Sequence, residues 1–321
     1  MKRFLLPLYA FFIVGFVFAY SQVSQASTGK KIIIVTSTPD LAWAIREIGG
    51  EHVEVQSLLT GREDPHFVDA RPDYVAKVGK ADVVCGVGLE LEVGWLPKVL
   101  AKAARKDIQP GGNGFCEFGS NVAVLEKPVG PVDRSQGDVH PGGNPHFWLS
   151  PTVFAKATRE AISAIERVRP ELKGSFEARY SEYSRMMLGL ESRLAAKLRQ
   201  AGIAGVNARY AEYHREFVYF AKSFGLEGVA TLEEKPGLSP SAARLARVAG
   251  ELKAEKVSLV IASSTAPQKL LQKFQELSGL KVAVVPVSVR PKTEFESYPK
   301  MIENIVDALI EISRQNQKKV Q

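Results

Sequence analysis

Three of the five histidines in this sequence occur in contexts that suit the binding of a metal ion. His66 lies in "DPHF", His146 in "NPHFW" and His214 in "AEYHREF". A proline before the histidine fixes φ at about −65° and stiffens the loop, which suits a side chain that must point in one direction. Neutral imidazole is the commonest transition-metal ligand, and three imidazoles favour Zn²⁺ over Ca²⁺ or Mg²⁺. The pattern predicts a metal site.

Each histidine by itself is weak evidence, because a lone loop histidine is more often a surface or packing residue. Of the remaining two, His52 precedes a predicted strand, and His140 lies in a loop rich in glycine and proline. We expect neither to be a ligand, although His140 could still meet a metal at the mouth of a cleft.

The elements that must position these side chains alternate between strand and helix. Residues 30–37, 52–59 and 81–88 are apolar runs that predict buried strands, and Pro39 and Pro72 each open a predicted helix. Such alternation is typical of a mainly parallel sheet with helices on its faces.

The second half repeats the alternation, with predicted strands at residues 257–264 and 281–289. Predicted helices cover residues 215–225, 241–255, 267–279 and 298–315. Apolar residues at steps of three and four predict one long helix over residues 171–200, about 45 Å in length. Within the first half, residues 110–144 predict loops interrupted by one short strand at residues 121–126.

The first 26 residues predict a secretory signal, with a basic start, an apolar run and a small-residue cleavage site before Ser27. An uncleaved anchor is the alternative. Loss of Lys2 and Arg3 takes the net charge from +7 to +5, and the other basic residues are scattered, so nucleic acid is a poor partner. No cysteine follows the apolar run, which argues against a lipid anchor.

Two cysteines, Cys85 and Cys116, remain in this exported chain. They could form a disulfide, or Cys85 could be a buried thiol in an apolar strand, and the sequence favours neither. Neither has a neighbour at metal-ligand spacing.

Taken in order, these motifs resemble the zinc- and manganese-binding substrate-binding proteins of ABC importers, over nearly all of the mature chain. The resemblance rests on "KIIIVTSTPDLAWAIREIGGEHVEV", "DPHFVDARPDYVAKVGKADVVCGVGLELEVGWL", "NPHFWLSP", the long helix, and "YHREFVYFAKSFGLE" with "EEKPGLSPSAARLARV". It implies an α/β fold of two lobes joined by one rigid helix, with a metal ion held between the lobes and delivered to a membrane permease.

By the matching motifs, the resemblance implies that His66, His146 and His214 are the nitrogen ligands of Zn²⁺, with Mn²⁺ as the competing ion. It implies an N-terminal lobe at residues 27–170, the connecting helix at 171–200, a C-terminal lobe at 201–321, and a periplasmic protein that we expect to be a monomer.

The chain departs from the family at the fourth ligand. A carboxylate often follows the last core strand, but Ser288 and Val289 stand there, and Ser263-Ser264 replaces a second acid. Water, Glu294, Asp64 or no group at all could complete the site, and water is the preferred expectation.

A zinc hydrolase of the cell envelope is the alternative from another class, since three histidines and a water also describe a catalytic site. The sequence argues against it, because no HExxH helix occurs and no carboxylate is obviously placed as a general base, with Glu212, two residues before His214, as the candidate. We expect Glu212 to be a solvated loop residue and the protein not to be an enzyme.

Overall fold

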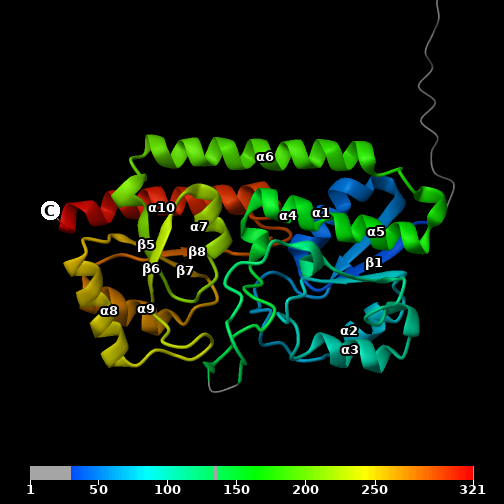
Figure 1. Cartoon of the computed structure of the whole chain (residues 1–321), viewed down its shortest axis with the longest axis horizontal. Coiled ribbons are helices and arrows are strands. Elements are labelled where there is room, and N and C mark those ends of the chain that lie inside the picture. Colours follow the sequence, from blue (N-terminus) through cyan, green and yellow to red (C-terminus); the bar gives the residue numbers. More distant parts are fainter. Residues whose placement is uncertain (1–29, 134–135, 321) are drawn as a thin grey trace, which may run out of the picture.

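The computed structural model describes residues 30–133 and 136–320, with the side chains of residues 318–320 excepted. It has two lobes, each with its own parallel sheet, and helices that cover the sheets (Figure 1). The predicted secretory signal at residues 1–26 lies outside the described residues. Across those two described stretches, no helix combines the length and the apolar character needed to cross a bilayer.

The first sheet has the strand order β2-β1-β3-β4, and every pairing is parallel. Its strands are β1 (Ile32–Thr36), β2 (Val53–Ser57), β3 (Val83–Gly86) and β4 (Phe115–Glu117). Every residue of β3 is buried, as expected for an inner strand covered by helices on both faces.

Helices of the first lobe begin at prolines in several places, because a fixed φ suits the first helical turn. They are α1 (Pro39–Gly49), α2 (Pro72–Val78), α3 (Leu96–Ala103), α4 (Pro151–Ala157) and α5 (Arg159–Val168). Short 3-10 helices among the described residues include η1 (Gly50–His52), η2 (Lys106–Ile108), η3 (Phe118–Asn121), η5 (Phe147–Leu149), η6 (Pro170–Leu172) and η7 (Gly205–Ala208).

The second sheet has the matching order β6-β5-β7-β8, again with all pairings parallel. Its strands are β5 (Arg209–Glu212), β6 (Glu227–Thr231), β7 (Leu259–Ser263) and β8 (Ala283–Val285). The helices of this part are α7 (Val218–Phe224), α8 (Ala242–Ala254), α9 (Gln268–Ser278) and α10 (Tyr298–Val320). The predicted fold class, two α/β lobes with parallel sheets, is confirmed.

The long helix α6 (Glu177–Gln200) runs along both lobes at the top of Figure 1. With 24 residues it is about 36 Å long. It begins six residues later than the predicted start at Glu171, because Pro170 opens the short turn η6 and Gly174, at φ +79°, separates that turn from the helix. The buried residues on one face of α6, from Tyr183 and Met187 to Leu198, are among the apolar positions whose spacing predicted the helix.

One hydrophobic cluster is shared by the two lobes, and each lobe also has a smaller cluster of its own. A single cluster of buried side chains extends from Ile32 in β1 to Ile312 in α10. Trp43 of α1 stacks on Tyr298 of α10 with ring centroids 5.5 Å apart, and Trp148 Nε1 donates to the Val287 carbonyl at 2.8 Å. These contacts fix the position of one lobe against the other.

Some sequence predictions of elements were wrong. Residues 121–126 form no strand, and the strand of that region is β4, which lies earlier within the glycine-rich text. Strands β5 and β6 were not predicted, because β5 begins and ends with a charged residue and β6 is partly exposed, so neither is a long apolar run. Helix α3 was not predicted either.

Cys85 and Cys116 form a disulfide between the paired strands β3 and β4. The pairing register places these residues opposite each other, with Cα atoms 4.7 Å apart. Of the two alternatives that the sequence left open, the structure has the disulfide.

Candidate metal centre

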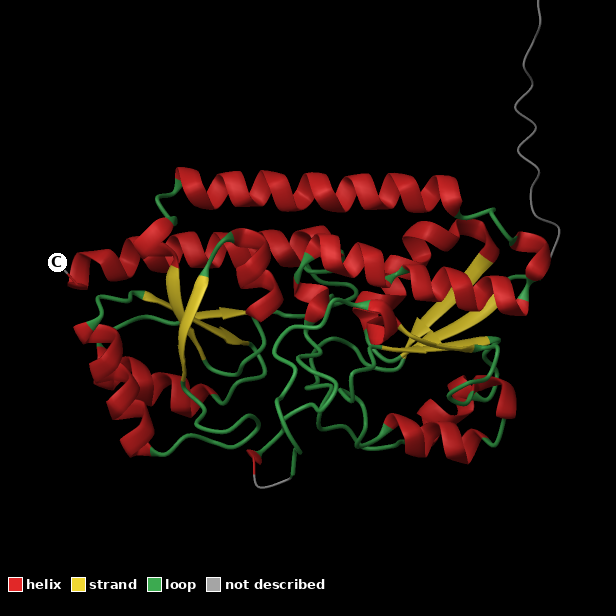
Figure 2. Ribbon diagram, in the orientation of Figure 1, coloured by secondary structure: helices red, strands yellow, loops and turns green. Residues whose placement is uncertain are grey.

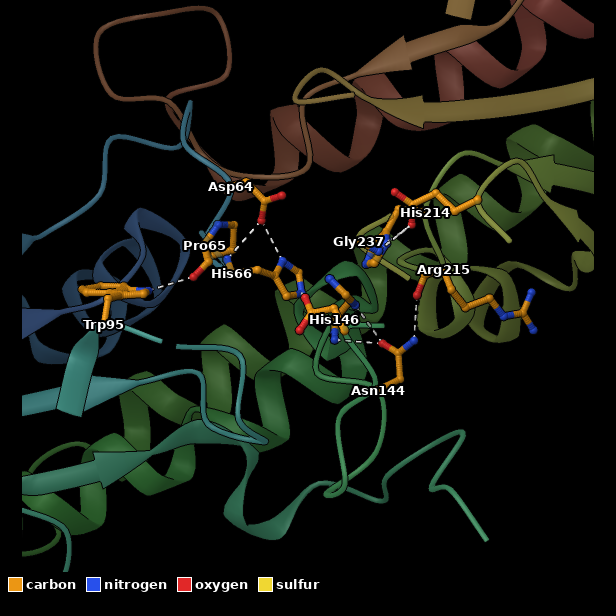
Figure 3. Close-up of polar contacts among 11 residues, drawn as sticks. Asp64, Pro65, His66, Trp95, Asn144, His146, His214, Arg215 and Gly237 are labelled. Atoms are coloured by element: carbon orange, nitrogen blue, oxygen red, sulfur yellow. Dashed lines mark hydrogen bonds and ion pairs between the residues drawn. The ribbon is translucent and has the colours of Figure 1, made fainter. Parts of the chain in front are cut away.

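The three predicted histidines lie in loops that follow the carboxyl ends of strands, as expected for ligand sites of parallel sheets. His66 follows β2 and His146 follows β4 in the first lobe, whereas His214 follows β5 in the second. Figure 3 shows these side chains converging between the lobes. We refer to them below as the three-histidine cluster.

His66 is held by the residue two positions before it. Asp64 Oδ1 accepts hydrogen bonds from the backbone N–H of His66 at 3.0 Å and from its Nδ1 at 2.7 Å. The indole Nε1 of the buried Trp95 donates to the Pro65 carbonyl at 2.8 Å, which anchors the turn (Figure 3). Although burial favours neutral Asp64, the hydrogen bonds and charge of His66 hold the pKa of this carboxyl below its usual value.

His146 repeats this arrangement with an amide in place of the acid. Asn144 Oδ1 accepts from the backbone N–H of His146 at 3.0 Å and from its Nδ1 at 2.9 Å. Asn144 Nδ2 donates to the Arg215 carbonyl at 2.8 Å, which fixes the orientation of the amide (Figure 3). Because the amide oxygen can only accept, Nδ1 of His146 carries the proton and Nε2 keeps its lone pair.

His214 is oriented by a carboxylate from the loop after β6. Glu233 Oε2 accepts from His214 Nδ1 and from the Gly237 backbone N–H, both at 2.9 Å. Burial alone would lower the pKa of His214, but the hydrogen bond to Glu233 and the charges of Glu216 and Asp64 raise it to about 9. An ion that binds Nε2 of His214 therefore competes with a proton at neutral pH.

The three imidazoles come close enough to share one ion. One ligand atom from each lies within 4.8 Å of the others, and the ring centroids are 5.2 to 5.4 Å apart. With each Nδ1 engaged, the Nε2 atoms are the ones free to coordinate. Burial, followed by the charges of the neighbouring histidines, lowers the pKa of His146 well below its usual value, so this imidazole is neutral and able to coordinate.

The candidates for a fourth ligand do not all reach the cluster. Asp64 is engaged with Nδ1 of His66, and Glu294 is exposed. At the position where the resemblance led us to expect a carboxylate, the Ser288 hydroxyl donates to Asp40, and the Val289 N–H donates to Asp40 Oδ1 at 2.9 Å. This segment therefore ties the lobes together.

Two residues of the loop before Asn144 also lie beside the cluster: His140, for which the sequence left a place at the mouth of a cleft, and Asp138, which the sequence did not indicate. The His140 ring lies 5.2 Å from the ring of His66, and Asp138 Oδ2 lies 3.7 Å from His66 Nε2. Burial and, after it, the charges of His66 and His214 lower the pKa of His140 to about 3. His140 is thus a neutral imidazole beside the three-histidine cluster and not a surface histidine.

Two buried glutamates also lie near the cluster. Glu216 is 5% exposed, and burial raises its pKa to about 8. Glu212 was expected to be a solvated loop acid, but it is fully buried at the end of β5. Its oxygens accept from Arg215 Nη1 at 3.0 Å and from the Phe217 N–H at 2.9 Å, so it is engaged within its own lobe.

A cleft with a volume of about 200 Å³ is lined in part by the three histidines. Both lobes line it, with Thr38 and Asp40 from the first and Ser263, Ser264 and Arg290 from the second. The cluster thus lies where the two lobes meet, in the wall of this cleft.

Two α/β lobes, each built on a parallel sheet (Figure 2), with a histidine cluster between their loops define the class of two-lobed α/β binding proteins. The profile of one family, described as "Zinc-uptake complex component A periplasmic", matches residues 34–312. The chain belongs to this family, and the resemblance inferred from its motifs is confirmed.

Curated relatives and solved structures agree with this membership. The chain is 26% identical over 273 residues to the zinc-binding lipoprotein AdcA of Streptococcus pneumoniae serotype 4, a match that covers 84% of this chain and about half (52%) of AdcA. It is 23% identical over 265 residues to the high-affinity zinc uptake system protein ZnuA of Bacillus subtilis, covering 82% of this chain and 80% of that protein. The periplasmic zinc-binding protein TroA from Treponema pallidum superposes with a TM-score of 0.72 at 18% identity, covering 88% of this chain and 99% of TroA, and so shares the fold.

Proposed function

We propose that this protein captures Zn²⁺ between its lobes and delivers it to the membrane permease of an ABC importer. The observation that carries the proposal is the convergence of three imidazoles from both lobes, each with its Nδ1 held by an oxygen acceptor. Such acceptors orient the ring and raise the basicity of the coordinating Nε2. Membership of the zinc-uptake family supports the same function.

Zinc is the preferred cargo in this proposal, because imidazole nitrogens suit Zn²⁺ and Mn²⁺ favours more oxygen ligands. Mn²⁺ remains the competing ion. The protein binds the ion without chemistry on it, in the periplasm, as a monomer that a signal at residues 1–26 exports.

The hydrolase alternative requires a carboxylate that can act as general base toward a metal-bound water. Glu212, the acid two residues before His214 that the sequence analysis considered for this role, has its two oxygens engaged by Arg215 and Phe217. That engagement argues for a binding protein rather than an enzyme.

Native mass spectrometry of the protein from Ser27 onward, after chelation and titration with Zn²⁺ and Mn²⁺, tests the proposal. We expect one zinc per chain, lost in His66→Ala and in His146→Ala. His52→Ala is the matched control, because His52 lies against Phe176, with the rings 5.9 Å apart, and faces no other histidine. Equal zinc binding by all three variants would refute the assignment.

A further inference from the structure

The loop of residues 136–143 is attached to both lobes beside the three-histidine cluster. The backbone N–H of Asp138 donates to the Pro236 carbonyl of the second lobe at 2.8 Å. The Gly142 N–H donates to Glu90 Oε2 of the first lobe at 3.2 Å. These bonds place the side chains of the loop at the junction of the lobes.

The loop lies so close to the second lobe that two positions require glycine. Gly137 has φ +87°, and a Cβ there would lie 2.4 Å from the Pro236 carbonyl oxygen. A Cβ on Gly237 would lie 3.0 Å from the Cβ of Asp138. The backbone is thus shaped to bring Asp138 against the loop that also orients His214.

Three buried polar atoms at this junction have no hydrogen-bond partner within the described residues. They are His66 Nε2, Asp138 Oδ2 and His140 Nε2, which make up three of the seven such side-chain atoms. A buried polar group without a partner costs about 1–3 kcal/mol, so three at one point call for an explanation. When the Nε2 atoms of both imidazoles are unprotonated, as metal binding requires, their lone pairs and the carboxylate cannot satisfy one another, whereas a single cation satisfies all three.

The spacing of these atoms suits a metal ion. One ligand atom from each of the three residues lies within 4.8 Å of the others, and Asp138 Oδ2 is 3.7 Å from His66 Nε2. Neighbouring ligands of a tetrahedral zinc lie about 3.3 Å apart, given zinc–nitrogen bonds of about 2.0–2.1 Å. Contractions of between about 0.4 Å and about 1.5 Å would therefore bring the group to coordinating distance.

His66 belongs to this group and to the three-histidine cluster as well. Its one free nitrogen, Nε2, can bind only one ion, so the two groups cannot each hold an ion through His66. Of the arrangements that remain, one ion shared by both groups is the one that leaves none of the three buried atoms without a partner.

We propose that Asp138 and His140 are further ligands of the ion held by the three-histidine cluster. They take the place of the carboxylate that the family usually carries after the last core strand and that Ser288 replaces here. This inference rests on the proposed function, because it concerns the same ion.

Zinc affinity by competition with a chelator and X-ray absorption at the zinc edge, on the protein from Ser27 onward, test the inference. His140→Gln and Asp138→Asn should each weaken zinc binding about 10-fold or more. The absorption spectrum should report four imidazoles in the unaltered protein and three in His140→Gln. Asp133→Asn, a change of the same kind in an exposed residue of the same segment, is the control and should bind as the unaltered protein does.

The outcomes separate this inference from the proposed function. If His146→Ala abolishes binding while His140→Gln and Asp138→Asn bind zinc as tightly as the unaltered protein, the loop ligands are refuted and the function stands. If only one of the two loop variants binds normally, the assignment of that residue is overturned. Absence of stoichiometric zinc in the unaltered protein would instead refute the proposed function.

Discussion

Removal of the charge on Glu233 should weaken zinc binding without disturbing the fold. Its Oε2 accepts from both His214 Nδ1 and the Gly237 N–H, and its side chain is 9% exposed. In Glu233→Gln the amide oxygen can still accept from Nδ1, but the negative charge that favours a cation at Nε2 is lost. Loss of such an orienting partner costs about 10–100-fold in metal affinity, or about 1.4–2.7 kcal/mol.

We expect Glu233→Gln at the lower end of that range and Glu233→Ala at the upper end, because alanine also leaves Gly237 N–H without its acceptor. The next residue offers the control: Glu234 pairs with Arg247 at 3.2 Å and its side chain is 65% exposed. Zinc affinity of Glu233→Gln, Glu233→Ala and Glu234→Gln is measured by chelator competition at neutral pH, with thermal unfolding to verify folding. If Glu233→Gln binds zinc as Glu234→Gln does, the proposed coupling between Glu233 and the ion is refuted.

Two further predictions concern stability. Leu194→Ala in α6 should lower the free energy of unfolding by about 2–5 kcal/mol, since Leu194 is 2% exposed. Leu188→Ala, at a position 55% exposed, should change it by at most about 0.5 kcal/mol. Urea unfolding measures both effects, and equal effects would contradict the packing described for α6. Burial raises the pKa of Asp40 from 3.8 to about 6, in spite of its hydrogen bonds from Ser288 and Val289. The protonated carboxyl therefore contributes fully to folding below about pH 3.8. That contribution, about 3 kcal/mol, is lost as the pH rises through about 6. The stability difference between the unaltered protein and Asp40→Asn should therefore change between pH 4 and pH 7, as urea unfolding at several pH values would show; a difference independent of pH would rule out this titration.

The sequence predicted the features of the fold that depend on local patterns. The apolar runs of β1, β3 and β7 and the prolines that open α1 and α2 correspond to elements of the structure. By contrast, β6 is partly exposed along its whole length and so lacks the apolar pattern that marks a buried strand. Its place in the sheet depends on pairing with β5, which is a tertiary contact.

The candidate site likewise has residues that local sequence patterns indicate and residues whose position depends on tertiary contacts. The proline-histidine dipeptides marked His66 and His146, and the structure brings both into contact with His214. The repeated spacing of Asp64 and Asn144, each two residues before a histidine, was a signal for their orienting role that the sequence analysis did not use. The approach of His140 to His66 could not be predicted, because it depends on how loop 136–143 folds between the lobes.

The position of Tyr298 has a consequence for the order in which the protein can fold. This residue begins the last helix, yet its ring is fully buried against Trp43 and Phe154 of the first lobe, and its hydroxyl donates to the Trp148 carbonyl. The aromatic core of the first lobe therefore stays incomplete until nearly 300 residues have left the ribosome. A chain that emerges from N- to C-terminus lacks the stacking partner of Trp43 in the last helix until that helix arrives.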